Sequence, residues 1–200
     1  MTRRISFGLL GVALAVSWAI ALSAQAPAGD GPKYAAGTNN LLRPADYREW
    51  IFLGASLGLD YRPPMAGQPP GFGNVFVNPS SYRSFMQTGK WPDKTEFVLE
   101  FRASGKEAIA DREGRFQTNL TGIEAEVKDL RFPDGWGFFV FNNPDAATKG
   151  SAPLGGDTVQ RCIDCHSTKT AVERTFVQFY PTLFDVAKRM GTVKKDYTDP

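Results

Sequence analysis

Apolar and polar side chains alternate along several stretches of the chain, and an alternation of period two predicts β-strands. Residues 95–102 and 123–128 both place apolar side chains at every second position and charged or polar ones between them. A short run with Val-Phe-Val at its centre (residues 74–78) and an almost wholly apolar run (residues 136–141) predict further strands. We therefore expect three or four antiparallel strands.

Helical spacing of apolar residues occurs nearer the two ends of the chain. Residues 44–59 begin with a proline and repeat apolar side chains every three or four positions, which predicts an amphipathic helix. Pro79 at a first helical turn and Gly89 as a stop predict a second helix. We expect two more helices, at residues 157–166 and within residues 175–190, where an extended stretch runs into a helix. These elements predict an α+β fold, a mainly antiparallel sheet with flanking helices.

The first 26 residues have the pattern of a secretory signal peptide. Arg3 and Arg4 precede an apolar run at residues 5–22, and small residues follow at the positions before a cleavage site. We expect cleavage after Ala26, with Ala28 as the second choice, and a periplasmic location for the mature protein. The alternative is an uncleaved membrane anchor, although the apolar run is near the lower length limit for a span.

The remaining chain divides into a short leader and one domain. Residues 27–40 are rich in glycine, proline and alanine, so we expect a flexible leader, and residues 41–200 are long enough to bury a core of their own. Removing the signal peptide takes away two arginines and no acids, which lowers Lys+Arg from 23 to 21, equal to the 21 Asp+Glu. A near-neutral domain lacks the basic surface of nucleic-acid-binding proteins, so we expect no nucleic-acid partner.

A C-x-x-C-H motif, Cys162 to His166, carries the strongest chemical signal in the sequence. Both cysteines of the chain and its one histidine lie in this motif. Such a motif indicates covalent attachment of haem c, because two thiols on one helical turn can each bond to the same porphyrin edge. The next residue then supplies an axial nitrogen to the iron. This attachment takes place outside the cytoplasm, so the motif and the signal peptide support each other.

Other chemistry remains open for the same residues. A redox-active C-x-x-C would need a strand-to-helix context early in a βαβ unit, whereas this pair follows a glycine-rich loop near the C-terminus. A zinc site would need further ligands, and the chain holds no second histidine or third cysteine. If the protein were an electron carrier with a sixth ligand on iron, the available methionines would be Met65, Met86 and Met190.

Several strings in order along the chain resemble cytochrome P460 and the related cytochromes c′-beta. The similarity runs from about Leu41 to Leu183, and no string except the haem motif is diagnostic alone. The strings are YREW (47–50), VFVNPSSY (75–82), WPD (91–93), GIEAEVKD (122–129), WGFF (136–139), the C-x-x-C-H motif and FYP (179–181).

The resemblance implies a mainly antiparallel sheet, a homodimer, and one five-coordinate haem with His166 as its proximal ligand. Cytochrome P460 oxidises hydroxylamine and carries a lysine bonded to the porphyrin rim. Cytochromes c′-beta lack that bond and bind nitric oxide or carbon monoxide in an apolar pocket. Leu99 stands at the position of the cross-linking lysine, and leucine cannot form the bond, although Lys90, Lys94 and Lys106 flank the strand. We therefore favour the c′-beta-like branch.

The resemblance also suggests residues around the ligand. Glu124 corresponds to a carboxylate that takes protons from a nitrogen substrate, but Glu124, Glu126 and Lys128 also fit the solvated face of a strand. Phe72 and Phe76 are candidates for aromatic caps, and equally for ordinary core residues. The sequence thus leaves three functions: a cytochrome that binds small gaseous or nitrogenous ligands, a hydroxylamine-oxidising enzyme, and an electron carrier with a protein redox partner.

Overall fold

A five-stranded antiparallel sheet forms the centre of the chain in the computed structural model, which describes residues 29–59, 68–106 and 114–198. The strands are hydrogen-bonded in sequence order, β1-β2-β3-β4-β5, so each strand pairs with the one before it. The predicted signal peptide and Met65 lie outside the described residues. The strands are β1 (Ile51–Leu57), β2 (Phe72–Val77), β3 (Thr95–Gly105), β4 (Phe116–Lys128) and β5 (Trp136–Val140).

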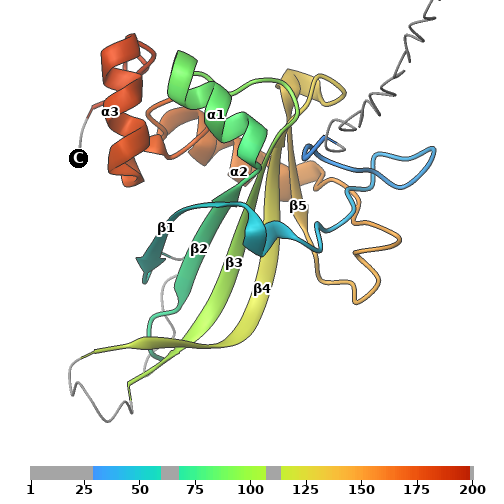
Figure 1. Cartoon of the computed structure of the whole chain (residues 1–200). Coiled ribbons are helices and arrows are strands. Elements are labelled where there is room, and N and C mark those ends of the chain that lie inside the picture. The colour runs from blue at the N-terminus through green and yellow to red at the C-terminus, as the bar shows by residue number, and fades with distance from the viewer. Residues whose placement is uncertain (1–28, 60–67, 107–113, 199–200) are drawn as a thin grey trace, which may run out of the picture.

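Three α-helices gather around one end of this sheet, and β3 and β4 extend past the other end (Figure 1). They are α1 (Pro79–Thr88), α2 (Gly156–Thr168) and α3 (Pro181–Met190). Single 3-10 turns lie before β1 (Tyr47–Glu49), between β4 and β5 (Pro133–Gly135) and before α3 (Val177–Phe179). Each of the four predicted strands and three of the predicted helices are present, which confirms the α+β fold. No helix among the described residues is long and apolar enough to cross a membrane.

The helix predicted at residues 44–59 is wrong. Only Tyr47–Glu49 forms a turn of 3-10 helix, and Ile51–Leu57 is the strand β1, paired antiparallel with β2. A bulge between Phe52 and Gly54 shifts the register of this strand. The bulge breaks the strict alternation of apolar side chains and leaves a spacing that imitates a helix. Pairing with β2 therefore decides the structure of this segment.

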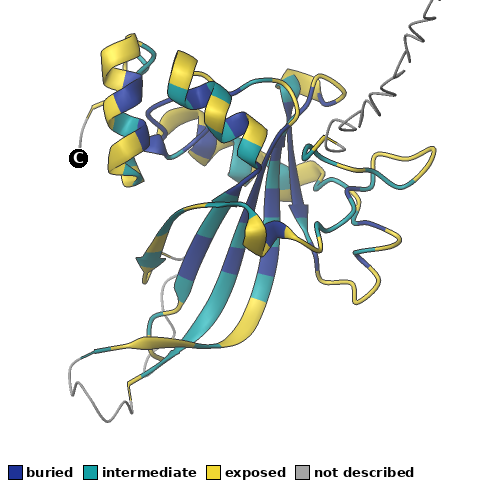
Figure 2. Cartoon of the chain, in the orientation of Figure 1, coloured by how far each residue is buried: buried dark blue, intermediate teal, exposed yellow. Residues whose placement is uncertain are grey.

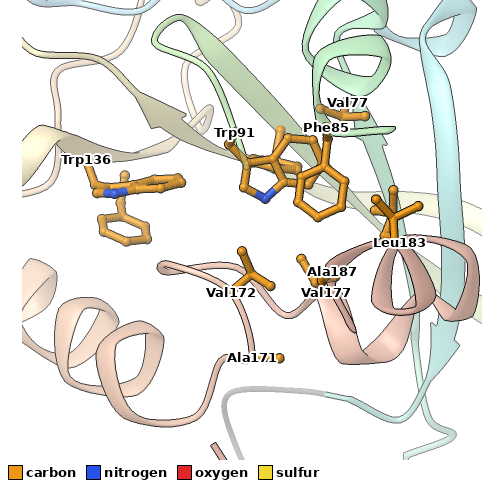
Figure 3. Packing of buried hydrophobic residues seen from close by; sticks show 12 residues of the cluster. Val77, Phe85, Trp91, Trp136, Ala171, Val172, Val177, Leu183 and Ala187 are labelled. Carbon is orange, nitrogen blue, oxygen red and sulfur yellow. The ribbon is translucent and has the colours of Figure 1, made fainter. Parts of the chain in front are cut away.

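Each face of the sheet carries its own hydrophobic core. On the face that bears the helices, here called the helix face, Val77 and Phe97 pair across β2 and β3 and pack against residues of all three helices. Figure 3 shows Phe85 and Trp91 side by side in this core, with ring centroids 4.1 Å apart. The opposite face buries Val98, Ala125 and Phe139, among others, under Leu41 and Tyr47. Burial on both faces holds the sheet in one register, because a slip of one residue would exchange the two cores.

The described part of the expected leader, residues 29–40, makes contacts with the domain. The Asp30 carboxylate accepts a 2.7 Å hydrogen bond from the Ser80 backbone N–H at the start of α1. The Tyr34 hydroxyl donates to Asp129 at 2.9 Å, and Leu41 forms a bridge to Ser151. A carboxylate at a helix N-terminus is favourable because unpaired N–H groups collect there.

The helix face becomes less covered toward the far end of β3 and β4, where Figure 2 shows intermediate burial. Val75, Leu99 and Phe101 lie on this part of the face and are half-buried. Gly73 and Gly122 are the cross-strand partners of Phe101 on either side and add no side chain of their own to this face, where Leu99 lies against Gly73 and Phe101 against Gly122. This leaves a shallow apolar area of sheet next to the helices.

Candidate functional site

The two cysteines lie on consecutive turns of α2, three residues apart, with His166 directly after the second. Both thiols are free: Cys162 is half-buried against the core of the helix face, and Cys165 is exposed. Residues three and four apart on a helix share one side of it, so Cys162, Cys165 and His166 face neighbouring directions. Burial raises the pKa of the Cys162 thiol, and the nearby charges of Glu124 and Glu126 raise it further. These two carboxylates of β4 therefore lie on the side of α2 that carries the motif.

His166 is buried and its ring is held on several sides. Its Nδ1 lies 2.8 Å from the Arg174 carbonyl oxygen, and a carbonyl only accepts hydrogen bonds. Nδ1 therefore carries the proton, and in the neutral ring the lone pair is on Nε2. The rings of Phe138 on β5 and Phe176 stand edge-on to the imidazole, each with its centroid 5.0 Å away. Histidines that bind metals are commonly held in the same way, with the other ring nitrogen hydrogen-bonded to a protein acceptor.

A carboxylate stands beside the same imidazole nitrogen. Glu126 Oε1 lies 3.2 Å from His166 Nδ1, although it is not aligned for a hydrogen bond to it. Burial alone would lower the pKa of His166, but the Glu126 charge and the bond to the Arg174 carbonyl oxygen outweigh it and leave the pKa raised. The imidazole is thus buried, with the negative charge of Glu126 next to its Nδ1.

The shallow apolar area adjoins this motif on the same face of the sheet. Leu99 and Glu124 are direct partners across β3 and β4, and both are half-buried on the helix face. Gly54 on β1 belongs to the same face, and a Cβ at this position would come 3.2 Å from the Tyr180 ring. Two thiols, an available imidazole nitrogen and a flat apolar sheet surface fit a haem. Cys162 and Cys165 would hold its edge and His166 its iron.

Phe72 and Phe76 are not brought together with these residues. Phe76 pairs with Val98, which places it on the opposite face of the sheet, where its ring lies 5.5 Å from those of Tyr47 and Phe52. Phe72, four residues before Phe76, pairs with Arg102 and shares that face. The structure therefore gives both phenylalanines the place of core or surface residues away from His166.

The candidates for other ligands are also dispersed. Met86 packs against the core of the helix face, and Met190 is half-exposed at the end of α3. Lys94 pairs with Asp129 rather than with any residue of the motif. Within the described part of the chain, no three His, Cys, Asp or Glu side chains form a group that could hold a metal ion.

The match to a known protein family covers this site. The sequence model of the family described as Cytochrome P460 matches residues 44–177, two thirds of the chain, and the matched span includes β1 to β5 and the C-x-x-C-H motif. The chain belongs to the cytochrome P460 family. Membership makes it a haem-binding cytochrome and confirms the resemblance found in the sequence at the level of the family. A search of curated proteins finds no match.

Proposed function

We propose that this cytochrome is exported and carries a single haem c, bonded through Cys162 and Cys165, with His166 as the axial ligand of its iron. We propose further that it binds small diatomic or nitrogen-oxide ligands such as nitric oxide and carbon monoxide. The observation that carries the proposal is the 2.8 Å contact between His166 Nδ1 and the Arg174 carbonyl oxygen. It fixes the tautomer that leaves Nε2 as a ligand, directly after two free thiols on the same helix.

One group of residues holds the imidazole of His166, and another forms the apolar surroundings proposed for the ligand. Phe138 and Phe176 hold the imidazole ring in place, and the Arg174 carbonyl oxygen keeps the proton on Nδ1. The apolar side chains of Leu99 and Phe101 would exclude water and favour uncharged ligands over ions. When bound, the haem supplies a redox-active iron that can take a small ligand.

Leucine at position 99 supports the gas-binding alternative over a cross-linked enzyme. Leu99 has no nucleophilic atom, and it lies in the middle of the sheet with Val75 on one side and Glu124 on the other. Lys94 lies before β3 and is paired with Asp129, so it is engaged elsewhere. We therefore propose the branch without a bond between lysine and haem.

A periplasmic location and a homodimer are further proposals, the first from the signal peptide pattern and the second from analogy with the family. A protein redox partner would be needed if the iron changes oxidation state in the cell. Size-exclusion chromatography with light scattering tests the dimer. Fractionation of cells and N-terminal sequencing test export and the cleavage site.

Hydroxylamine oxidation is the second candidate, and the position of Glu124 favours it. Its carboxylate is on the helix face, half-buried, and close enough to Cys162 to raise the pKa of that thiol, after the larger effect of burial. A carboxylate there could accept protons from a nitrogen substrate. Turnover of hydroxylamine with an artificial electron acceptor would favour this candidate, and absence of turnover together with tight nitric oxide binding would favour the first.

The direct test uses the full chain matured in a host that attaches haem outside the cytoplasm. We expect the pigment to stay with the polypeptide in acidified organic solvent, and to be lost there from the double variant Cys162→Ser, Cys165→Ser. Ser167→Ala, on the same helix, is the matched control and should behave as the wild type. We expect the spectrum of high-spin, five-coordinate iron, and we expect this spectrum to change when carbon monoxide is added. Colourless protein would contradict haem binding, and a low-spin His/Met spectrum would indicate the electron carrier.

A further inference from the structure

We propose that Glu126 is a positioning residue for the axial imidazole, one that strengthens the electron donation of His166 to the iron. The inference rests on the proposed function, which makes His166 the axial ligand. The inference gives a role to Glu126, for which the alternation along the sequence predicts only a position on a solvated strand face.

The position of Glu126 on the sheet brings its carboxylate to the imidazole. Glu126 lies between its cross-strand partners Phe97 on β3 and Phe138 on β5, and the Phe138 ring itself contacts His166. The side chains of His166 and Glu126 are only 11% and 13% exposed. A carboxylate with so little access to water exerts a stronger field on its neighbour than one at the surface.

One imidazole N–H therefore faces two acceptors of different strength. The Arg174 carbonyl oxygen, 2.8 Å away, holds the hydrogen bond, and Glu126 Oε1 stands 3.2 Å away beside it. Within the described residues, Oε1 has no hydrogen-bond partner of its own, so its charge is directed at the imidazole without competition from another donor. A carboxylate next to the distant nitrogen of a metal-bound imidazole makes the ring more basic and a stronger donor.

Other charges near the ring do not cancel this arrangement. Lys128, the next residue on this face of β4, is paired with Glu173 at 2.6 Å. The Arg174 guanidinium lies 3.4 Å from Asp134, and its charge acts on the imidazole in the opposite direction to that of Glu126. Glu126 is thus the carboxylate in contact with the ring, and its removal should leave the imidazole a weaker donor.

The test compares Glu126→Gln with the wild type, both matured with haem. Glutamine keeps the shape of the side chain and removes its charge. We expect the reduction potential to rise by an amount equivalent to at least a tenfold change in the ratio of ferric to ferrous protein, about 59 mV for one electron. We expect the iron–histidine stretching frequency of the ferrous protein to fall in the resonance Raman spectrum. A residue with only a structural role would move neither quantity.

Two further variants make the experiment decisive. Asp185→Asn removes an exposed carboxylate on α3 that is paired with Lys188, so it controls for net charge and should change neither quantity. Glu126→Asp keeps the charge at shorter reach and should give smaller shifts of the same sign. If Glu126→Gln does not accumulate, the aspartate variant decides, because an unchanged potential and frequency in it would contradict the inference.

The outcomes separate this inference from the proposed function. Variants that bind haem with histidine as the axial ligand, but keep the wild-type potential and stretching frequency, would overturn the role of Glu126 and leave the proposed function intact. A wild-type protein that matures without haem, or whose iron shows no histidine ligand, would overturn both.

Discussion

Leu99 on β3 and Glu124 on β4 are direct cross-strand partners on the helix face, so an apolar and an acidic side chain stand next to each other near the C-x-x-C-H motif. Replacing Glu124 by Gln removes the proton acceptor and keeps its shape. For the gas-binding protein that we propose, we expect carbon monoxide affinity to change by less than about threefold. For an enzyme, loss of a general base would reduce turnover by about 10²-fold or more.

Carbon monoxide titration of the ferrous protein and a hydroxylamine assay with an artificial acceptor measure the two effects. Thr121→Ser, on an exposed position of the same strand, is the control and should change neither. A large loss of carbon monoxide affinity in Glu124→Gln would contradict the prediction, because it would make the carboxylate part of the gas site.

Glu100 on the opposite face should contribute to stability in a pH-dependent way. Its buried carboxylate accepts hydrogen bonds from Arg102 at 2.5 Å, from Arg48 at 2.7 Å and from the Tyr47 hydroxyl. Burial alone would raise the pKa of this carboxyl, but the bonds, led by that from Arg102, lower it from 4.5 to about 2. Its contribution, about 3 kcal/mol, is complete above pH 4.5 and is lost as the pH falls toward 2.

Urea unfolding of wild type and Glu100→Gln between pH 7 and pH 2 tests this contribution. The difference in free energy of unfolding should be largest at pH 7 and should shrink below pH 4.5, since protonation then neutralises the wild-type carboxylate too. Asp145→Asn removes an exposed carboxylate paired with Lys149, and we expect less than about 1 kcal/mol from it. A Glu100→Gln difference that does not vary with pH would refute the assignment.

Glu96 on the same face of β3 should act in the opposite sense. Burial raises the pKa of its carboxyl well above 4.5, Asp46 raises it further, and Lys33 lowers it in part. Because the folded protein holds this proton more tightly than the unfolded chain, stability falls as the pH rises from 4.5 toward the raised pKa. Glu96→Gln removes this cost, so we expect it to raise the free energy of unfolding at pH 7.

The gain should disappear at pH 4, where the glutamate is protonated in both folded and unfolded protein. Denaturant titrations at pH 4, 5.5 and 7 follow the effect. Glu49→Gln, in the exposed part of the 3-10 turn before β1, serves as the control and should show no comparable trend. Destabilisation by Glu96→Gln at pH 7 would show that the carboxyl has a partner that the amide cannot replace.

Gly89 ends α1 in a left-handed conformation with φ of +67°, and space there is limited as well. A Cβ at this position would lie 2.7 Å from Thr192 Oγ1 and 2.9 Å from Met190 Cβ. We expect Gly89→Ala to lower the free energy of unfolding by about 2 kcal/mol or more, measured by urea unfolding. Gly29→Ala, where nothing lies within 4 Å, should have little effect. Equal effects of the two substitutions would mean that backbone strain at Gly89 is not important.

Most of the fold could be predicted from the chain because alternation and helix end signals are local properties. Strands β2 to β5 and helices α1 to α3 have such signals in their own sequences. The strand β1 could not be predicted in this way, because its bulge disturbs the alternation and its pairing with β2 is a long-range contact. The attachment of Asp30 to α1 is equally a contact between distant residues, and a sequence rich in glycine and proline gives no sign of it.

The site was predictable where its residues are adjacent in sequence, and less so elsewhere. Cys162, Cys165 and His166 form one motif, whereas Phe138, Arg174 and Glu126 meet the imidazole only through folding. The alternation along β4 predicts its two faces, but it does not tell a solvated charged face from one covered by a helix, and Glu126 is only 13% exposed. That face lies under α2, because the other side of β4 already packs against a second core.

This double burial of β4 makes the surroundings of the His166 imidazole, the proposed axial ligand, depend on strand pairing. Glu126 reaches His166 because its side chain points to the helix face, whereas those of its neighbours Ala125 and Val127 belong to the core of the opposite face. A shift of the strand by one residue would turn the Ala125 or Val127 side chain toward the imidazole. It would also bury the carboxylates of β4 in the hydrophobic core of the opposite face. Bulges in the pairing of β3 and β4 lie before Ile123, so the stretch of β4 that carries Glu126 keeps an unbroken register.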